Sequence, residues 1–412
     1  MNRLLVPAIT GMALALPQCG SRPVSDNAEP SETSPADSSA VIRRVGALRS
    51  ARSAHAATSL ANNQVLVSGG MRTGGEALKS WELFDANTNQ IVAVGEMAAA
   101  RVDHSATLLP DGRVLVAGGY NGNYLPTAEV FDPATGRFTA TGSMSEGRSG
   151  HTATLLADGT VLVTGGVGDG WSFLSTAEIY HPDTHRFTRV GSMRVPRESQ
   201  TATLLSNGQV LIAGGHRGRR ENIEVYRSTE IYDPARRAFQ SGPPMHIARH
   251  KHEAIGLADG RVLVVGGSDP RDRTRFVSTE LYDPRTGAFS DAQPMGLRRY
   301  KIRGTAVQLP DSRVLVAGGA RFAELYDPRD GMFRRVAGDF GHGYSFARAT
   351  LLATGDVLII GGYDDGMAAT AGVWRFNERR VSSRRVTEPK GVLEYLSGLA
   401  AINILLLTAL AE

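Results

Sequence analysis

The sequence predicts an all-β fold, a seven-bladed β-propeller in which similar four-stranded sheets close into a ring. Three observations predict it. A double glycine recurs seven times at steps of roughly 50 residues. Tight Asp-Gly or Asn-Gly turns precede several of these glycines. The fourth strand has a characteristic spacing of an aromatic or branched residue, a Met or Leu, and an Arg, and the same spacing recurs near the N-terminus. A unit of this length cannot bury its apolar face alone, so neighbouring units must stack.

The double glycines each end a short apolar run, which we expect to be the second strand of a blade. A tight turn joins that run to the strand before it, and Asp158-Gly159 is an example, because both residues of such a turn need positive φ. The seven double glycines are Gly69-Gly70, Gly118-Gly119, Gly165-Gly166, Gly214-Gly215, Gly266-Gly267, Gly318-Gly319 and Gly361-Gly362.

The fourth strand carries a register of its own. An aromatic or branched residue is followed six residues later by Met or Leu and ten residues later by Arg, as in Phe138, Met144 and Arg148. Residues 42–52 show the same register before the first double glycine, whereas the segment after the last one, 381–386, lacks it. We therefore expect the N-terminal strand to complete the seventh blade and to leave no exposed sheet edge there.

The double glycine, the Tyr-Asp-Pro after the third strand and the Met-x3-Arg-x2-His junction together resemble the kelch repeat, over residues 41 to 380. Kelch propellers serve as adaptors, sugar-binding modules and occasional enzymes, so the resemblance implies the fold and leaves the function open. In this family the repeated histidine bonds between blades, and we expect that role for it here. The alternative is a ring of metal ligands. The histidines are His55, His104, His151 and His252, with Gln200, Gly304 and Ala347 in the same place elsewhere.

The glutamates repeated on the third strand are expected to be scaffold residues, not general acids. They are Glu82, Glu129, Glu178, Glu230, Glu280 and Glu324.

Both chain ends differ from the repeats. Residues 1–19 resemble a bacterial lipoprotein signal, in which Cys19 would be lipidated, although Pro17 and Gln18 depart from that pattern and plain secretion is the alternative. We expect a Ser/Pro/acidic linker over 20–40, the propeller over 41–388 and an apolar helix over 389–412 that is too short to span a membrane. The protein is thus expected to be an exported monomer, at the outer membrane, cell surface or periplasm as a lipoprotein and otherwise secreted.

Catalysis and cofactors find little support in the sequence. Galactose oxidase shares the propeller architecture, but its copper site uses a tyrosine crosslinked to a cysteine, and the only cysteine here, Cys19, lies in the signal. No catalytic residue, metal site, cofactor or nucleic-acid motif is identified. We expect a binding module and keep a carbohydrate-active enzyme with an unrecognised channel site as the alternative.

The loops after the double glycines vary in length, and variable loops on a rigid scaffold are where binding usually resides. A basic sector and an aromatic, sugar-stacking sector on one face predict an acidic glycan or an acidic protein partner. The alternative is that these charges only keep the face soluble. The basic candidates are Arg217, Arg219, Arg220, Arg271, Arg273, Arg275 and Arg299, and the aromatic candidates are Tyr120, Tyr124, Trp171 and Tyr363.

Overall fold

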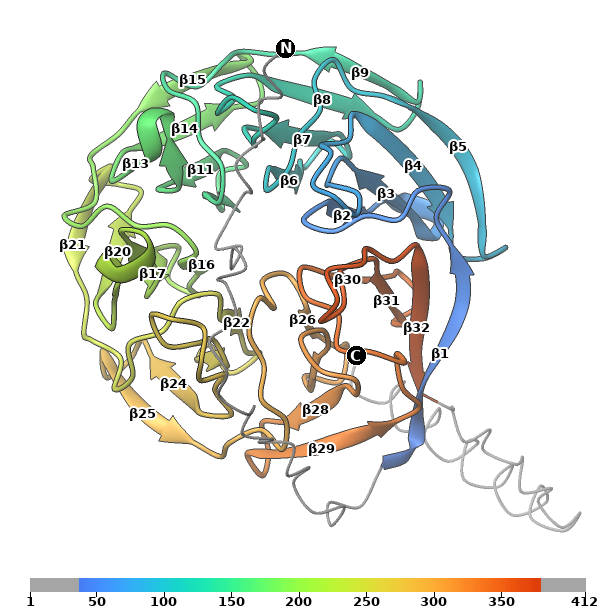
Figure 1. Ribbon diagram of the computed structural model, residues 1–412. Helices are drawn as coiled ribbons and strands as arrows, with labels where there is room; N and C mark the ends of the chain where they lie inside the picture. Colours follow the sequence, from blue (N-terminus) through green and yellow to red (C-terminus); the bar gives the residue numbers. More distant parts are fainter. Residues whose placement is uncertain (1–36, 379–412) are drawn as a thin grey trace, which may run out of the picture. The chain divides into compact units, whose positions relative to one another are not determined.

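The computed structural model describes residues 37–378, which form a ring of seven four-stranded blades around a central axis (Figure 1). Five blades are separate sheets, and blades 6 and 7 join edge to edge in one eight-stranded sheet. Blades are numbered in the chain order of their double glycines. The described residues contain no α-helix, so the predicted all-β, seven-bladed fold is confirmed. Three 3-10 helices occur in this range: η1 (Ala61–Asn63), η2 (Asp169–Trp171) and η3 (Arg220–Asn222).

The two inner strands of each blade lie nearest the axis. The second strands are apolar and buried because neighbouring blades cover both of their faces. The first strands are β2 (Ala56–Ser59), β6 (Ser105–Leu108), β10 (Thr152–Leu155), β16 (Thr201–Leu204), β22 (Glu253–Gly256), β26 (Ala306–Gln308) and β30 (Arg348–Leu351). The second strands are β3 (Gln64–Ser68), β7 (Val114–Ala117), β11 (Val161–Thr164), β17 (Val210–Ala213), β23 (Val262–Val265), β27 (Val314–Val316) and β31 (Val357–Ile360).

The two outer strands complete each blade. The third strands are β4 (Ser80–Asp85), β8 (Ala128–Asp132), β14 (Ala177–His181), β20 (Thr229–Asp233), β24 (Thr279–Asp283), β28 (Glu324–Asp327) and β32 (Gly372–Glu378). The fourth strands are β5 (Gln90–Glu96), β9 (Arg137–Ala140), β15 (Arg186–Arg189), β21 (Ala238–Ser241), β25 (Ala288–Ala292), β29 (Met332–Ala337) and, for blade 7, β1 (Asp37–Ala47). Short hairpins follow the double glycines of blades 3 and 4: β12 (Val167–Gly168) with β13 (Ser172–Phe173), and β18 (His216–Arg217) with β19 (Glu224–Val225).

The N-terminal strand β1 closes the ring, as predicted. It lies between β32 and β29 (Figure 1), and beyond its end Leu48 N donates to Ala371 O at 2.8 Å. Ile42 is 3% exposed and shares a buried cluster with Phe376. β1 begins at Asp37, slightly before the expected boundary. The expected signal, most of the linker and the C-terminal helix lie outside the described residues.

At six of the seven junctions between blades, a buried arginine holds the neighbouring blades together. Arg249 donates to Gly266 O at 2.7 Å and to Glu280 Oε1 at 2.8 Å, and Arg299 binds Gly318 O and Glu324 in the same way. Charge-assisted bonds of this kind satisfy carbonyls that the glycine turn leaves without partners. The scaffold role of the repeated glutamates is confirmed. The six arginines are Arg52, Arg101, Arg148, Arg197, Arg249 and Arg299, all essentially unexposed.

The placement of Arg299 corrects one expectation. We expected its side chain on the loop face, but the guanidinium turns into the interface between blades, where it is fully buried and paired. It is therefore not available to a ligand, and we leave it out of the candidate site.

Three of the four repeated histidines, His104, His151 and His252, join blades as expected, whereas the ring nitrogens of His55 are buried without a hydrogen-bond partner. His104 Nε2 lies 3.1 Å from Ser68 Oγ of the preceding blade, and His151 Nε2 lies 2.9 Å from Ser105 Oγ. Burial lowers the pKa of His104 to about 3, so its ring is neutral. No helix in the described part of the chain is long and apolar enough to cross a membrane.

Candidate functional site

One residue in each blade, directly before the repeated histidine position, has a left-handed backbone. Their φ values lie between 50° and 63°, a region that residues other than glycine seldom occupy. Peptide groups bond from blade to blade: Asp103 N donates to Ala54 O at 3.1 Å, and Lys301 N donates to Lys251 O at 2.9 Å. We call these residues the axial belt: Ala54, Asp103, Gly150, Ser199, Lys251, Lys301 and Phe346.

Six of the seven belt residues line a small cavity on the axis. Its volume is about 20 Å³, which is room for a single particle of about the size of a water molecule. His252, Arg303 and Arg348 complete the lining. Four of the lining residues are cationic, and Asp103 is the one carboxylate among them. The cavity is therefore small and strongly charged.

A two-residue insertion in blade 6 crosses the axis at this level. Between the belt residue and the double glycine, blade 6 has two more residues than blade 5, which places an extra turn at Arg303-Gly304. The Arg303 guanidinium donates to the carbonyl of His151 in blade 3, on the far side of the ring. Arg348 Nη1 donates to Arg303 O at 2.6 Å, and the Glu253 carboxylate accepts from the backbone of Gly304. Blades 3, 5 and 7 thus all hold this turn.

A chain of buried polar side chains forms the wall from blades 4 and 5. Glu198 Oε2 lies 3.7 Å from His216 Nε2, and His216 Nδ1 lies 3.2 Å from His250 Nδ1. His250 Nε2 then lies 3.2 Å from Asp272 Oδ1, and Asp272 Oδ2 binds Lys251 Nζ at 2.5 Å. The belt residue Lys251 is therefore linked to Glu198 through three side chains.

Burial and hydrogen bonding shift the titration of this wall in different directions. Burial raises the pKa of Glu198 to about 7, with a further upward contribution from Asp103. Burial lowers the pKa of His216 well below its ordinary value, so this imidazole stays neutral. Although burial alone would raise it, hydrogen bonds from His250, Lys251 and Ser268 hold the pKa of Asp272 below its ordinary value.

The opposite wall is aromatic and surrounds Lys301. The ammonium donates to Tyr363 Oη at 2.9 Å and lies 4.8 Å from the Tyr300 ring centroid and 5.8 Å from that of Phe346. Burial lowers the pKa of Lys301 to about 8, and the nearby charge of Lys251 lowers it further. Within residues 37–378 no carboxylate contacts this lysine, which is held by the Tyr363 hydroxyl and lies close to the ring faces of Tyr300, Phe346 and Tyr363.

The basic sector predicted on blade 4 is partly paired. Arg217 binds Glu224 at 2.8 Å on the exposed β18–β19 hairpin. The Arg219 guanidinium lies over the ring of Trp171, which comes from blade 3. Arg220 belongs to η3, in the turn of the same hairpin. The predicted basic and aromatic sectors therefore meet here instead of facing each other.

The basic residues predicted on blade 5 lie at the rim. Arg271 and Arg273 are exposed, whereas Arg275 pairs with Asp365 of blade 7 at 3.5 Å and lies over the Tyr300 ring. Arg275 can reach blade 7 because the loop after the double glycine of blade 6, between Gly319 and Glu324, is short.

Three of the predicted aromatic residues have little exposed surface. Tyr120, Tyr124 and Tyr363 are at most 8% exposed, and the rings of Tyr120 and Tyr124 pack 4.9 Å apart. Trp171 is half-buried and meets Tyr124 edge to face. These rings build the inner wall of the face and leave little area for a sugar ring to stack on.

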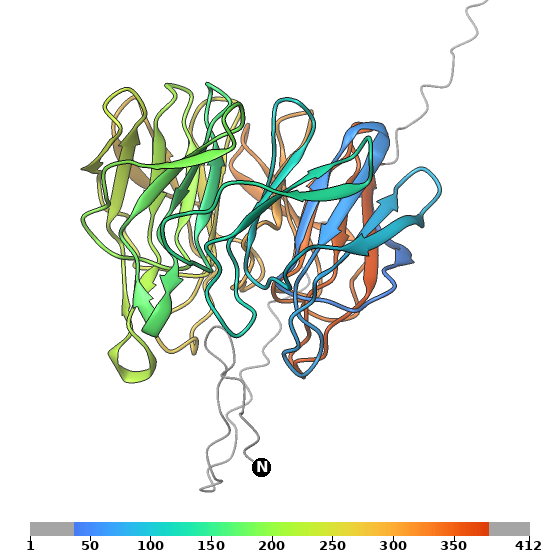
Figure 2. The ribbon, with the colours of Figure 1, turned by 90° about the horizontal axis from the view of Figure 1, so that it is seen from above.

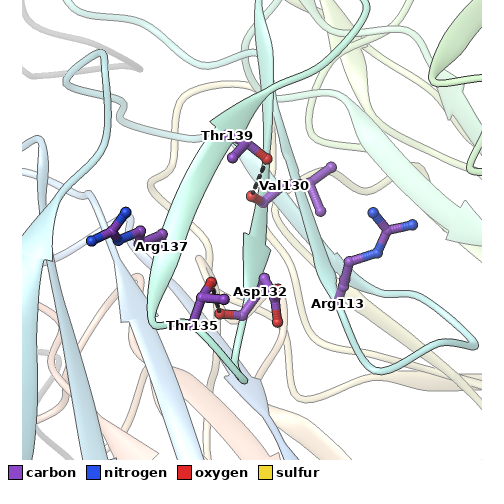
Figure 3. A pocket seen from close by; sticks show the side chains of 6 residues that line it. All are labelled: Arg113, Val130, Asp132, Thr135, Arg137 and Thr139. Carbon is purple, nitrogen blue, oxygen red and sulfur yellow. Dashed lines mark hydrogen bonds between the residues drawn. The ribbon is translucent and has the colours of Figure 1, made fainter.

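A larger hollow lies on the outer edge of blade 2, away from the axis (Figure 3). It has a volume of about 500 Å³ and is lined by Arg113, Val130, Asp132, Thr135, Arg137 and Thr139. Arg113 is bound to Asp111 at 2.7 Å, and the hollow is a shallow depression along β8 and β9. We place the candidate site at the axis instead, because that is where charged side chains of several blades converge.

Comparison with solved structures supports the fold. A fungal alcohol oxidase of the AA5 family, solved in complex with copper, matches 82% of this chain and 75% of its own with a TM-score of 0.65 and 18% sequence identity. At that identity the likeness concerns the fold alone. A search of curated proteins found no match.

The residues present do not fit a copper ion of that kind. Among residues 37–378, no three His, Cys, Asp or Glu side chains converge to hold a metal ion, and Cys19 lies outside this range. We therefore derive no chemistry through a metal.

Family models match the repeats themselves. The KLHDC2/KLHL20/DRC7 Kelch-repeats domain matches residues 37–215, and the Kelch motif matches residues 254–296. The matched residues include the N-terminal strand that closes blade 7 and the basic loop of blade 5. With its seven blades and its repeated double glycines, the chain is a kelch-repeat protein.

Proposed function

We propose that this protein is an exported binding module that recognises an acidic segment of a partner protein through the face that carries the hairpins. Kelch repeats suggest a binding or interaction role. The observation that carries the proposal is the set of exposed arginines at the rim of the axis, Arg271 and Arg273 with the neighbouring Arg275, beside a cavity that is too small for a whole ligand.

The size of the axial cavity favours recognition on the surface. Small-molecule sites typically enclose about 300–1,000 Å³, whereas the axial cavity measures about 20 Å³. A ligand on this face must therefore lie across the hairpins, as a protein partner does.

The burial of the aromatic rings favours a protein over a glycan. Sugar recognition needs exposed ring faces, and Tyr120, Tyr124 and Tyr363 are packed into the wall. The loops that follow the double glycines extend from one side of the ring, the lower side in Figure 2, so a partner on that side would meet several of them at once.

A charge-matched pair of variants tests this proposal. The loop variant Arg271→Gln/Arg273→Gln/Arg275→Gln removes three charges from the hairpin face. The control Arg236→Gln/Arg285→Gln/Arg329→Gln removes three exposed charges from the turns between third and fourth strands, at the opposite ends of the blades. Both variants should fold, because exposed substitutions usually change stability by no more than about 0.5 kcal/mol each.

Binding to an immobilised polyglutamate peptide and to an immobilised acidic polysaccharide is then measured at low and at physiological salt. We expect peptide affinity to fall at least about tenfold in the loop variant only, and its salt dependence to weaken. An equal loss in both variants would mean that net charge alone is sensed. Selective binding of the polysaccharide would replace the protein partner by a glycan.

Catalysis on a carbohydrate is the second candidate, and one observation favours it. Carboxyl groups with raised pKa values, Asp103, Glu198 and Glu253, gather near Arg303. Lys301, whose pKa is lowered, lines the same cavity as Arg303 and Asp103. Such convergence is common at active sites. Turnover of an acidic polysaccharide that is abolished by Asp103→Asn would establish it, and no turnover across a panel of such polysaccharides would remove it.

A further inference from the structure

We propose that the axial cavity is a binding site for one small monovalent anion of halide size. The site lies below the hairpin face, and it does not depend on the partner proposed above.

Three cations at this cavity have no carboxylate in contact. Among residues 37–378, Lys301, Arg303 and Arg348 form no ion pair within 4.0 Å. Their hydrogen bonds go to neutral oxygens: Tyr363 Oη for Lys301, His151 O for Arg303, and the carbonyls of Arg303 and Ala347 for Arg348. A buried cation without a counter-charge is costly, so such a cluster favours an anion among its members.

The charges around the cavity leave an excess of one positive charge. The cations are Lys251, Lys301, Arg303 and Arg348, and the nearby carboxylates are Asp103, Glu253 and Asp272, which gives four against three below about pH 7, where Glu198 is protonated. Asp272 is bound to Lys251 at 2.5 Å, and Glu253 is bound to backbone N–H groups of the inserted turn. One monovalent anion would balance the cluster.

The size of the cavity selects among anions. A volume of about 20 Å³ holds one particle of about the size of a water molecule. A halide ion fits that space, whereas acetate or gluconate does not. Two guanidinium groups and two ammonium groups line it, so the donors that an anion needs are already present.

Glu198 should make the site sensitive to pH. Its carboxyl lies near Asp103, Lys251, Arg219 and Arg303, with His216 neutral beside it and Tyr124 on the other side. Because its pKa is about 7, it becomes charged above that pH and supplies the missing negative charge itself. Lys301, with a pKa of about 8, then loses its proton. Both changes weaken anion binding as the pH rises, and they strengthen it below pH 7.

Thermal unfolding at constant ionic strength provides the test. Chloride replaces gluconate at about pH 6, and we expect a saturable rise of a few degrees in the Tm of the wild type, because a ligand that binds only the folded state stabilises it. Acetate should have no such effect. At about pH 8.5 the rise should be several-fold smaller.

Variants locate the effect. Arg303→Gln should lose the chloride-dependent rise, whereas Arg273→Gln, which removes an exposed charge from the hairpin face, should keep it. Crystals of the wild-type protein grown in bromide should show an anomalous peak in the cavity, whether or not Arg303→Gln folds. Equal Tm values in chloride and gluconate, an undiminished rise in Arg303→Gln, or no bromide peak would overturn the proposal.

Discussion

Tyr344 packs against Trp374 in blade 7, with ring centroids 5.1 Å apart, at the place where the other blades hold an arginine and a glutamate. Tyr344 O accepts from Gly319 N, as Arg299 O accepts from Gly267 N in the preceding blade. Trp374 pairs with Ile359 as Glu324 pairs with Val316. The blade that closes the ring therefore replaces a buried ion pair by an aromatic pair, an exchange that costs little when the volume is filled.

Gly372 is required for this aromatic pair. A Cβ at position 372 would overlap the Trp374 ring, so Gly372→Ala should lower the free energy of unfolding by about 1–3 kcal/mol. Denaturant titration measures the change. Gly256→Ala is the control, because its new Cβ would meet nothing closer than 3.9 Å. A partial recovery of stability when Trp374→Leu is added would show that the overlap is the cause, and equal stability of the two single variants would contradict the explanation.

Removing the charge of Arg299 should lower the free energy of unfolding far more than removing that of Arg273. Arg299→Met leaves Glu324 buried without its partner, and removal of one member of a buried pair typically costs about 3–5 kcal/mol. Arg273→Gln changes an exposed loop residue and should shift stability by no more than about 0.5 kcal/mol. Urea titration of both variants checks this difference. Similar midpoints would mean that the Arg299 pair does not hold the blades together.

Glu198 should make the protein less stable as the pH rises. Its pKa is 4.5 in an ordinary environment and about 7 when folded, so between these values the folded state binds more protons than the unfolded state. The free energy of unfolding therefore falls as pH rises through this window. Glu198→Gln should be close to the wild type near the lower end and more stable by about 3 kcal/mol above the upper end. Parallel pH profiles for the two proteins would rule out the buried carboxyl as the cause.

Cys19 tests the proposed export and anchoring. If Cys19 is lipidated, metabolic labelling with a fatty acid should tag the wild type, because the acyl chains are attached covalently through this residue. Acyl chains also hold a protein at the membrane, so the wild type should be found in the membrane fraction. Cys19→Ser should lose the label and move the protein to the soluble fraction. Membrane retention by the Cys19→Ser variant would place the anchor elsewhere in the chain.

Much of the fold could be predicted from the sequence because the repeat is regular. The double glycines gave the number of blades, and the register of Ile42 gave the strand that closes the ring. The repeated arginines were harder to place, since arginine is usually exposed and a sequence pattern does not show to which side of a junction a side chain turns. Arg299 was assigned to the surface for that reason.

The site was less predictable because it depends on a departure from the repeat. Counting back from the double glycine placed Gly304 at the histidine position, whereas the belt residue Lys301 shows that Ile302 occupies it and that Arg303-Gly304 is an insertion. The basic residues near 300 were visible in the sequence. Their contacts with His151 and Glu253 depend on how distant blades face one another across the axis, which spacing along the chain does not give.

The strand that closes the ring also sets the order of events in the life of the chain. Of the described strands, β1 is synthesised first and its partner β32 last, so the two can meet only after every blade has left the ribosome. Until then β1 lacks its partner strand β32, and the sheet of blade 7 lacks its outer strand. If the protein is exported unfolded, as we propose, this delay keeps the ring from closing before translocation is complete.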